Sequence, residues 1–101
     1  MVNIGYRPRM AALPAEVALS RGIIDDIDHA IIELLARRRA VVKGIFAKKK
    51  TLGLPLVDPG RESELVHDRC AYGRSLGVSP EFVEVIFRQV LEDSHSIDAG
   101  A

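Results

Sequence analysis

The chain has 101 residues, a length that suggests one domain. Lys plus Arg and Asp plus Glu each total 14, so the net charge is zero and gives no global attraction to nucleic acid or to an anionic membrane. The single cysteine, Cys70, excludes an internal disulfide, and no Cys/His cluster suggests zinc. No apolar run approaches the ~20 residues of a membrane span. We therefore expect a cytoplasmic protein without metal or cofactor.

Residues 1–13 predict a flexible N-terminal arm, and residues 14–101 predict one helical domain. From residue 14 to residue 52, apolar side chains recur at steps of three and four, which indicates one amphipathic helix. The members of this apolar stripe are Ile24, Ile27, Ile31, Leu34, Val41, Ile45 and Leu52. A break near Gly44 is the alternative, because glycine lowers helix propensity.

The length of this first helix indicates a partner. At 1.5 Å per residue it would extend about 58 Å, whereas a globule of this size has a radius of gyration of about 13 Å. The remaining residues cannot cover such a helix. The simplest partner is the same helix of a second chain, which predicts an intertwined, domain-swapped homodimer.

Two shorter helices should follow. Asp58 and Pro59 provide a cap and a first-turn proline for a helix at residues 59–76, and Gly77 ends it. Ser79, Pro80 and Glu81 repeat the start signal for a helix at residues 80–97. The core candidates on these two helices are Leu65, Tyr72, Leu76, Phe82, Ile86, Phe87, Val90 and Leu91. With no strand pattern, the fold class is all-α with three helices.

Three cations of the first helix are predicted to point toward its packed side. Arg38 shares the heptad phase of Ile24, Ile31 and Ile45, and Arg21 and Lys49 occupy the neighbouring phase. These side chains are rarely buried without a partner. They either belong to solvated basic runs and extend their charged ends to water, or they bind an anionic ligand inside the bundle.

The shorter helices add further polar candidates. Asp58, Arg61 and Glu62 fall within one turn, and they form either a helix cap with a first-turn acid or the polar mouth of a ligand site. Ser94 and Asp98 lie four residues apart on one helix face. The histidines occupy polar positions that we expect to be exposed, and no nucleophile–base arrangement or phosphate loop is evident.

These residues, in this order, resemble the all-helical AroQ class of chorismate mutases. The resemblance covers about residues 17–98 and opens with RGIIDDID at residues 21–28. It continues through LLARR at 34–38, Lys49, LPLVDPGRE at 54–62, Ile86 with Phe87, and EDS at 92–94. It implies a chain of three helices that intertwines with a second copy. It also implies that the protein rearranges chorismate to prephenate in phenylalanine and tyrosine biosynthesis, without a cofactor.

The resemblance also implies roles for the polar residues. Arg38 would grip one substrate carboxylate, and Arg21 of the other subunit would grip the second. Lys49 would face the ether oxygen of the dianionic substrate. Asp58 and Glu62 would hold the ring hydroxyl. The remaining carboxylate and wall contacts would come from Arg61 and Ser94.

Asp98 departs from the family pattern, which commonly has glutamine as a second donor to the ether oxygen. An ionised carboxylate would repel the negative charge that develops there, so Asp98 could help only when protonated. We therefore expect activity to improve as the pH falls, or glutamine at this position to raise it. The alternative is that a frayed C-terminus leaves Asp98 outside the site.

Other functions remain open at this point. A 4-amino-4-deoxychorismate mutase would use the same cations, with the acids meeting an ammonium group. An isochorismate-pyruvate lyase fits the set of Asp58, Arg61 and Glu62 less well. In a non-catalytic helical dimer, Arg38→Ala would be neutral or would increase stability, because it removes an unpaired buried charge.

Overall fold

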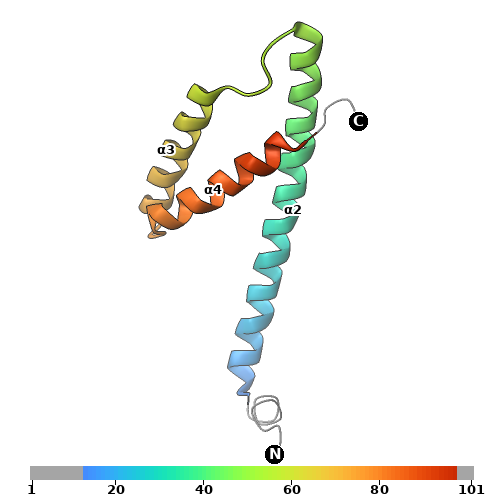
Figure 1. The fold of residues 1–101 in the computed structure, drawn as a ribbon. Helices are drawn as coiled ribbons and strands as arrows, with labels where there is room; N and C mark the ends of the chain where they lie inside the picture. Colours follow the sequence, from blue (N-terminus) through green and yellow to red (C-terminus); the bar gives the residue numbers. More distant parts are fainter. Residues whose placement is uncertain (1–12, 98–101) are drawn as a thin grey trace, which may run out of the picture. The chain divides into compact units, whose positions relative to one another are not determined.

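The computed structural model describes residues 13–97, which form three helices and no strand (Figure 1). The helices are α2 (Ala15–Leu52), α3 (Pro59–Ser75) and α4 (Pro80–His95). The all-helical prediction is confirmed, and each helix begins and ends within two residues of its predicted bounds. Of the predicted N-terminal arm, only Leu13 lies within the described residues.

Helix α2 runs through Gly44 without interruption, so the alternative of a break at this glycine is wrong. The helix ends in a Schellman motif, in which the Leu54 N–H donates to the Lys49 carbonyl at 2.8 Å and the Gly53 N–H donates to the Lys50 carbonyl at 3.2 Å. Gly53 adopts the positive φ of 67° that this motif requires. The motif fixes the point at which the chain leaves α2.

Helix α3 has a side-chain cap at its start and a glycine at its end. The Asp58 carboxylate accepts a hydrogen bond from the Arg61 N–H at 3.1 Å, and Pro59 occupies the first turn. At the other end, the Val78 and Gly77 N–H groups donate to the carbonyls of Gly73 and Arg74. Gly77 has φ of 80°, so this end is also a Schellman motif.

The chain divides into two compact units, residues 1–37 and 38–101. The second unit contains the end of α2 together with α3 and α4, and its main buried cluster consists of Leu65, Val66 and Leu91. Cys70 and Phe87 pack against this cluster. Helices α3 and α4 approach closely at Gly73, where an added Cβ would lie 2.6 Å from a methyl carbon of Val83.

The predicted core is partly wrong for the single chain. Leu65 and Leu91 are buried, but Tyr72, Leu76 and Phe82 are 66%, 64% and 59% exposed. On α4 the buried positions are Val83, Leu91 and Ser94, and Phe87 is half-buried. The prediction therefore holds for Phe87, Val90 and Leu91 and is wrong for Phe82 and Ile86, which are exposed. In the first turn of α4 the buried residue is Val83 in place of Phe82.

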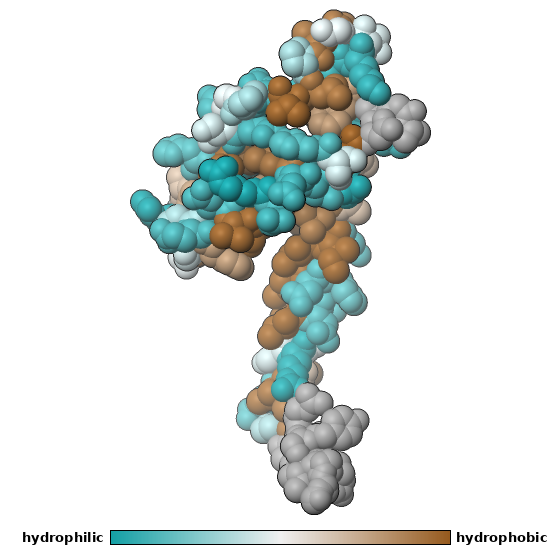
Figure 2. Space-filling model, viewed as in Figure 1, coloured by the Kyte–Doolittle hydropathy of each residue, from teal (hydrophilic) through white to brown (hydrophobic). Residues whose placement is uncertain are grey.

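The first unit contributes the N-terminal part of α2, and no residue between Pro14 and Arg37 is buried there. Four members of the apolar stripe lie in this part, and the exposed fractions are 54% for Ile24, 53% for Ile27, 51% for Ile31 and 59% for Leu34. Figure 2 shows apolar side chains gathered in a strip along this part of α2. None of the helices in the described part of the chain is both long and apolar enough to cross a membrane.

Candidate functional site

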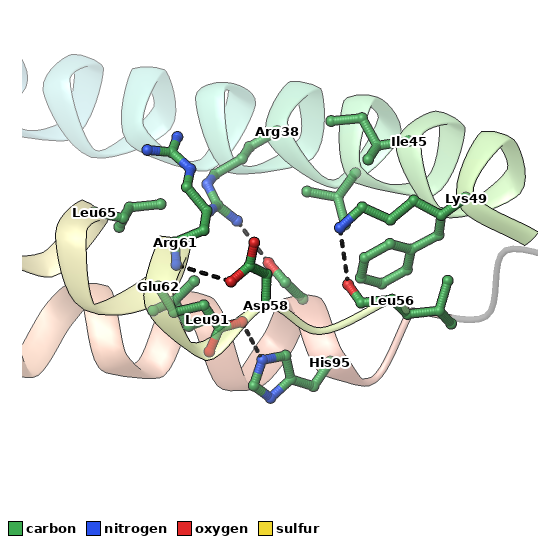
Figure 3. Close-up of a pocket in the computed structure, with 13 residues that line it drawn as sticks. Arg38, Ile45, Lys49, Leu56, Asp58, Arg61, Glu62, Leu65, Leu91 and His95 are labelled. Carbon is green, nitrogen blue, oxygen red and sulfur yellow. Dashed lines mark hydrogen bonds and ion pairs between the residues drawn. The ribbon is translucent and has the colours of Figure 1, made fainter. Parts of the chain in front are cut away.

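The second unit contains a pocket with a charged lining (Figure 3). Its volume is about 110 Å³. Its apolar wall consists of Val42, Ile45, Phe46, Leu56, Leu65 and Leu91. Its polar lining consists of Arg38, Lys49, Asp58, Arg61, Glu62, Ser94 and His95. The pocket thus combines an apolar wall with a few convergent polar groups, which is the usual make-up of a small-molecule site.

Arg38 is held in the pocket by a short hydrogen-bonded chain. Its Nη1 donates to Ser94 Oγ at 2.6 Å, and Ser94 Oγ donates to the Val90 carbonyl at 3.0 Å. Ser94 is only 5% exposed, so the hydroxyl is a fixed anchor. The contact joins α2 to α4, and it orients a guanidinium that could bind a carboxylate with its remaining donors.

The surroundings of Arg38 favour the binding of an anion. Burial lowers the pKa of the Arg38 guanidinium, and the neighbouring cations Arg69 and Arg61 lower it further, against an opposing effect of Asp93. Arg38 remains charged at neutral pH because a guanidinium loses its proton only in strongly alkaline solution. A bound anion would stabilise the charged guanidinium, because its negative charge would offset both the loss of solvent and the repulsion from the neighbouring cations.

Lys49 approaches the pocket from the end of α2. Eleven residues separate it from Arg38, which is close to three helical turns and places both side chains on one face of the helix. Its Nζ donates to the Leu56 carbonyl at 3.2 Å, in the segment between α2 and α3. One of its three donors is therefore used, and the half-buried ammonium group stays beside the pocket.

The acids of α3 line the pocket and also serve the helix. Asp58 caps α3 through the Arg61 N–H, and Glu62 lies in the first turn. The helix-cap interpretation is therefore confirmed. The ligand-site interpretation stays a prediction, which the cap allows because a capping carboxylate has a second oxygen that can accept a further bond. Glu62 also has a partner that the sequence did not predict, because its Oε2 lies 2.6 Å from His95 Nε2.

Six of the eight predicted site residues line the pocket, namely Arg38, Lys49, Asp58, Arg61, Glu62 and Ser94. Of the other two, Arg21 is an exposed residue of the first unit, and Asp98 lies outside the described residues.

His95 is exposed, as predicted, but the sequence interpretation did not predict that it lines the pocket, and it did not single out Arg69. The His95 side chain is 40% exposed but lines the pocket, and Arg69 acts on Arg38 by its charge. A spacing signal for each was present, since His95 follows Leu91 by four residues and Arg69 follows Leu65 by four. Among the described residues, no group of His, Cys, Asp and Glu could hold a metal ion.

The fold and the pocket define an all-helical protein whose half-buried cations, Arg38 and Lys49, could bind a small anionic molecule. The chain belongs to the family described as chorismate mutase type II, whose model matches residues 20–98.

Curated relatives agree with this membership. The chain is 34% identical over 82 residues to a T-protein of Enterobacter agglomerans, covering 81% of this chain and 22% of the relative. It is 29% identical over 76 residues to a T-protein of Haemophilus influenzae, covering 75% of this chain and 20% of the relative. A chorismate mutase of Methanocaldococcus jannaschii is 39% identical over 54 residues, which is 54% of each protein.

The chain thus spans about a fifth of the T-proteins and about half of the archaeal mutase. No solved structure matches the chain significantly.

Proposed function

We propose that this protein is a chorismate mutase, which rearranges chorismate to prephenate in the biosynthesis of phenylalanine and tyrosine. The observation that carries the proposal is the pair of cations from α2, Arg38 and Lys49, which line one pocket with an apolar wall. Family membership gives the substrate class, and the pocket supplies the charge that this class needs. We infer a cytoplasmic location, because no apolar run of the sequence approaches the ~20 residues of a membrane span.

The reaction makes few chemical demands on the protein. It is a one-step pericyclic shift in which the ether C–O bond breaks as a C–C bond forms, with no covalent intermediate and no proton transfer. The flexible dianionic substrate must be held as a compact chair, which offsets the loss of orientational freedom. The ether oxygen gains negative charge in the transition state, so a cation fixed beside it lowers the barrier.

The described residues can meet these demands. The guanidinium of Arg38, oriented by Ser94, would bind one carboxylate of the substrate. The ammonium of Lys49 would face the ether oxygen and stabilise it more strongly as the bond breaks. The Glu62 side chain would accept the hydrogen bond from the ring hydroxyl, and the backbone at Asp58 would contact the same hydroxyl. Arg61 would complete the contacts to the carboxylates.

We further propose that the active protein is an intertwined homodimer in which Arg21 of the second copy completes each site. The uncovered apolar residues Ile24, Ile27, Ile31 and Leu34 support this arrangement, since all are more than half exposed in the single chain. The pocket volume of about 110 Å³ also supports it, because ligand clefts commonly hold at least about 300 Å³. A second copy would cover the stripe and add walls to the pocket.

The experiment that tests the proposed activity follows the loss of chorismate absorbance between pH 5 and 8, with the product identified by mass. We expect prephenate formation by the wild-type protein and a loss of about 100-fold or more in kcat/KM for Arg38→Ala, with the fold retained. Arg37→Ala is the matched control, because Arg37 is an exposed neighbour on the same helix. A wild-type protein that leaves chorismate unchanged would contradict the proposal and favour a non-catalytic helical dimer.

A further inference from the structure

His95 is the one polar residue of the pocket lining to which neither the sequence nor the proposed reaction gives a role. It lies in the last turn of α4, and its Nε2 is 2.6 Å from Oε2 of Glu62 in the first turn of α3 (Figure 3). The two side chains are 40% and 26% exposed, so the contact lies at the mouth of the pocket. A carboxylate only accepts, so the His95 ring nitrogen is the donor.

The contact is placed where an ion pair suits both helices. An acid in the first turn of α3 and a basic residue in the last turn of α4 each lie at the favourable end of a helix dipole. The other charged groups that face the same pocket are Arg38 and Lys49 from α2 and Asp58 and Arg61 from the start of α3. Of the two pocket acids, Asp58 is engaged by a neutral backbone N–H, whereas Glu62 is engaged by a side chain that can carry charge.

This difference bears on the group that the substrate carries on its ring. A hydroxyl needs one acceptor oxygen and no net charge opposite it, and Glu62 keeps one oxygen for this purpose while His95 occupies the other. An ammonium group gains most from a carboxylate whose charge is not already balanced. A protonated His95 balances the charge of Glu62, so it lowers the advantage of an ammonium group and leaves the hydroxyl contact intact.

We propose that His95 is a specificity-determining residue that pairs with Glu62 and makes the site favour a ring hydroxyl over a ring ammonium group. The inference rests on the proposed mutase function and deepens it. It assigns discrimination between chorismate and its 4-amino-4-deoxy analogue to one side-chain pair. His95 orients and neutralises Glu62 and takes no part in the bond rearrangement.

The test measures kcat/KM for chorismate and for 4-amino-4-deoxychorismate in wild-type protein and in His95→Gln at pH 5.5 to 8.5. Glutamine keeps an N–H donor for Glu62 but cannot carry charge. At the acid end, we expect the amino-to-hydroxyl ratio of kcat/KM to be about tenfold higher in His95→Gln than in wild-type protein.

The ratios of the two proteins are compared at the same pH. Any change in the protonation of the amino substrate therefore affects both ratios equally. His67→Gln is the matched control, because His67 lies on α3 and does not line this pocket. It should leave the ratio unchanged.

Two negative results have separate meanings. Equal ratios in wild-type protein and His95→Gln at every pH, with chorismate turnover intact, would overturn this inference alone. Wild-type protein that converts neither substrate would overturn the proposed function together with it. A tenfold rise in the ratio in His67→Gln would also contradict the inference. It would show that the ratio can change without any change in the contact with Glu62.

Discussion

At the scale of single residues, the cations of α2 are the features that connect the sequence with the proposed chemistry. Arg38 interrupts an otherwise apolar heptad phase, which is compatible with a snorkelling side chain and with an anion-binding one. The structure gives this charge an anchor in Ser94, 56 residues away along the chain. The arrangement is preorganised, since the guanidinium is held by protein before any ligand arrives.

Six residues of the pocket lining were predicted from two signals together. Their spacing marked them as polar residues on packed faces or in one helix turn, and the family resemblance gave them a common ligand. His95 was not predicted, since its role depends on the packing of α4 against α3, which brings its ring to Glu62. From the sequence, a polar residue such as His95, next to Ser94, could equally be solvated or belong to a site. Only the orientation of the helix distinguishes the two cases.

Asp98 carries a prediction about pH at this scale. A carboxylate near the ether oxygen would oppose the developing negative charge when ionised and would donate a hydrogen bond when protonated. We therefore expect kcat of the wild-type protein to rise as the pH falls from 8 to 5. Asp98→Gln should raise kcat at pH 7.5 and flatten the profile, because an amide donates at every pH.

The measurement is the pH profile of kcat for both proteins, with Glu92→Gln as the control on an exposed position of α4. A flat wild-type profile, together with no gain from Asp98→Gln, would exclude a role for this carboxyl group.

At the scale of the helices, the bounds were predictable because each terminus has a local chemical signal. Asp58 and Ser79 cap α3 and α4, a proline follows each cap, and Gly53 and Gly77 end α2 and α3 with positive φ. These signals act within a few residues. The buried stripe of α4 was less predictable, since Phe82, Val83, Ile86 and Phe87 are all apolar and allow two helix phases.

Gly73 shows which phase packs and provides a prediction about stability. An added Cβ would lie 2.6 Å from Val83 Cγ2, so one helix must shift to admit it. We expect Gly73→Ala to lower the free energy of unfolding by about 1–3 kcal/mol, as overpacking usually does. Val83→Ala removes the clashing methyl group, so the double variant should lose less than the sum of the two single losses.

Urea denaturation followed by circular dichroism gives the three values. Gly44→Ala is the control, because a Cβ there meets nothing within 4 Å and an alanine favours the helix. Additive losses in the double variant would mean that Gly73 and Val83 do not determine the packing of α3 on α4.

At the scale of the whole molecule, the sequence indicated a partner through the length of its first helix, and the structure agrees on that length. The 38 residues of α2 form one helix. The part in the first unit presents apolar side chains that no other described residue buries. Burial of one such side chain is worth about 1.5–3 kcal/mol, so a strip of them is a strong driving force for association. That the partner is a second copy of this chain is a proposal, which this uncovered strip supports.

The central claim is a mutase site shared between two copies, and a mixing experiment tests it most directly. Arg21→Ala and Arg38→Ala proteins are each expected to have almost no chorismate mutase activity. They are unfolded together, refolded as a mixture, and assayed for prephenate. In a shared-site dimer, each mixed dimer has one intact site, with Arg38 of one copy and Arg21 of the other.

Random pairing would therefore restore about a quarter of the wild-type activity per chain. If each chain builds its site alone, every site in the mixture lacks one arginine and no activity returns. A mixture as inactive as its components, in which co-purification through an affinity tag on one variant shows mixed dimers, would contradict the account.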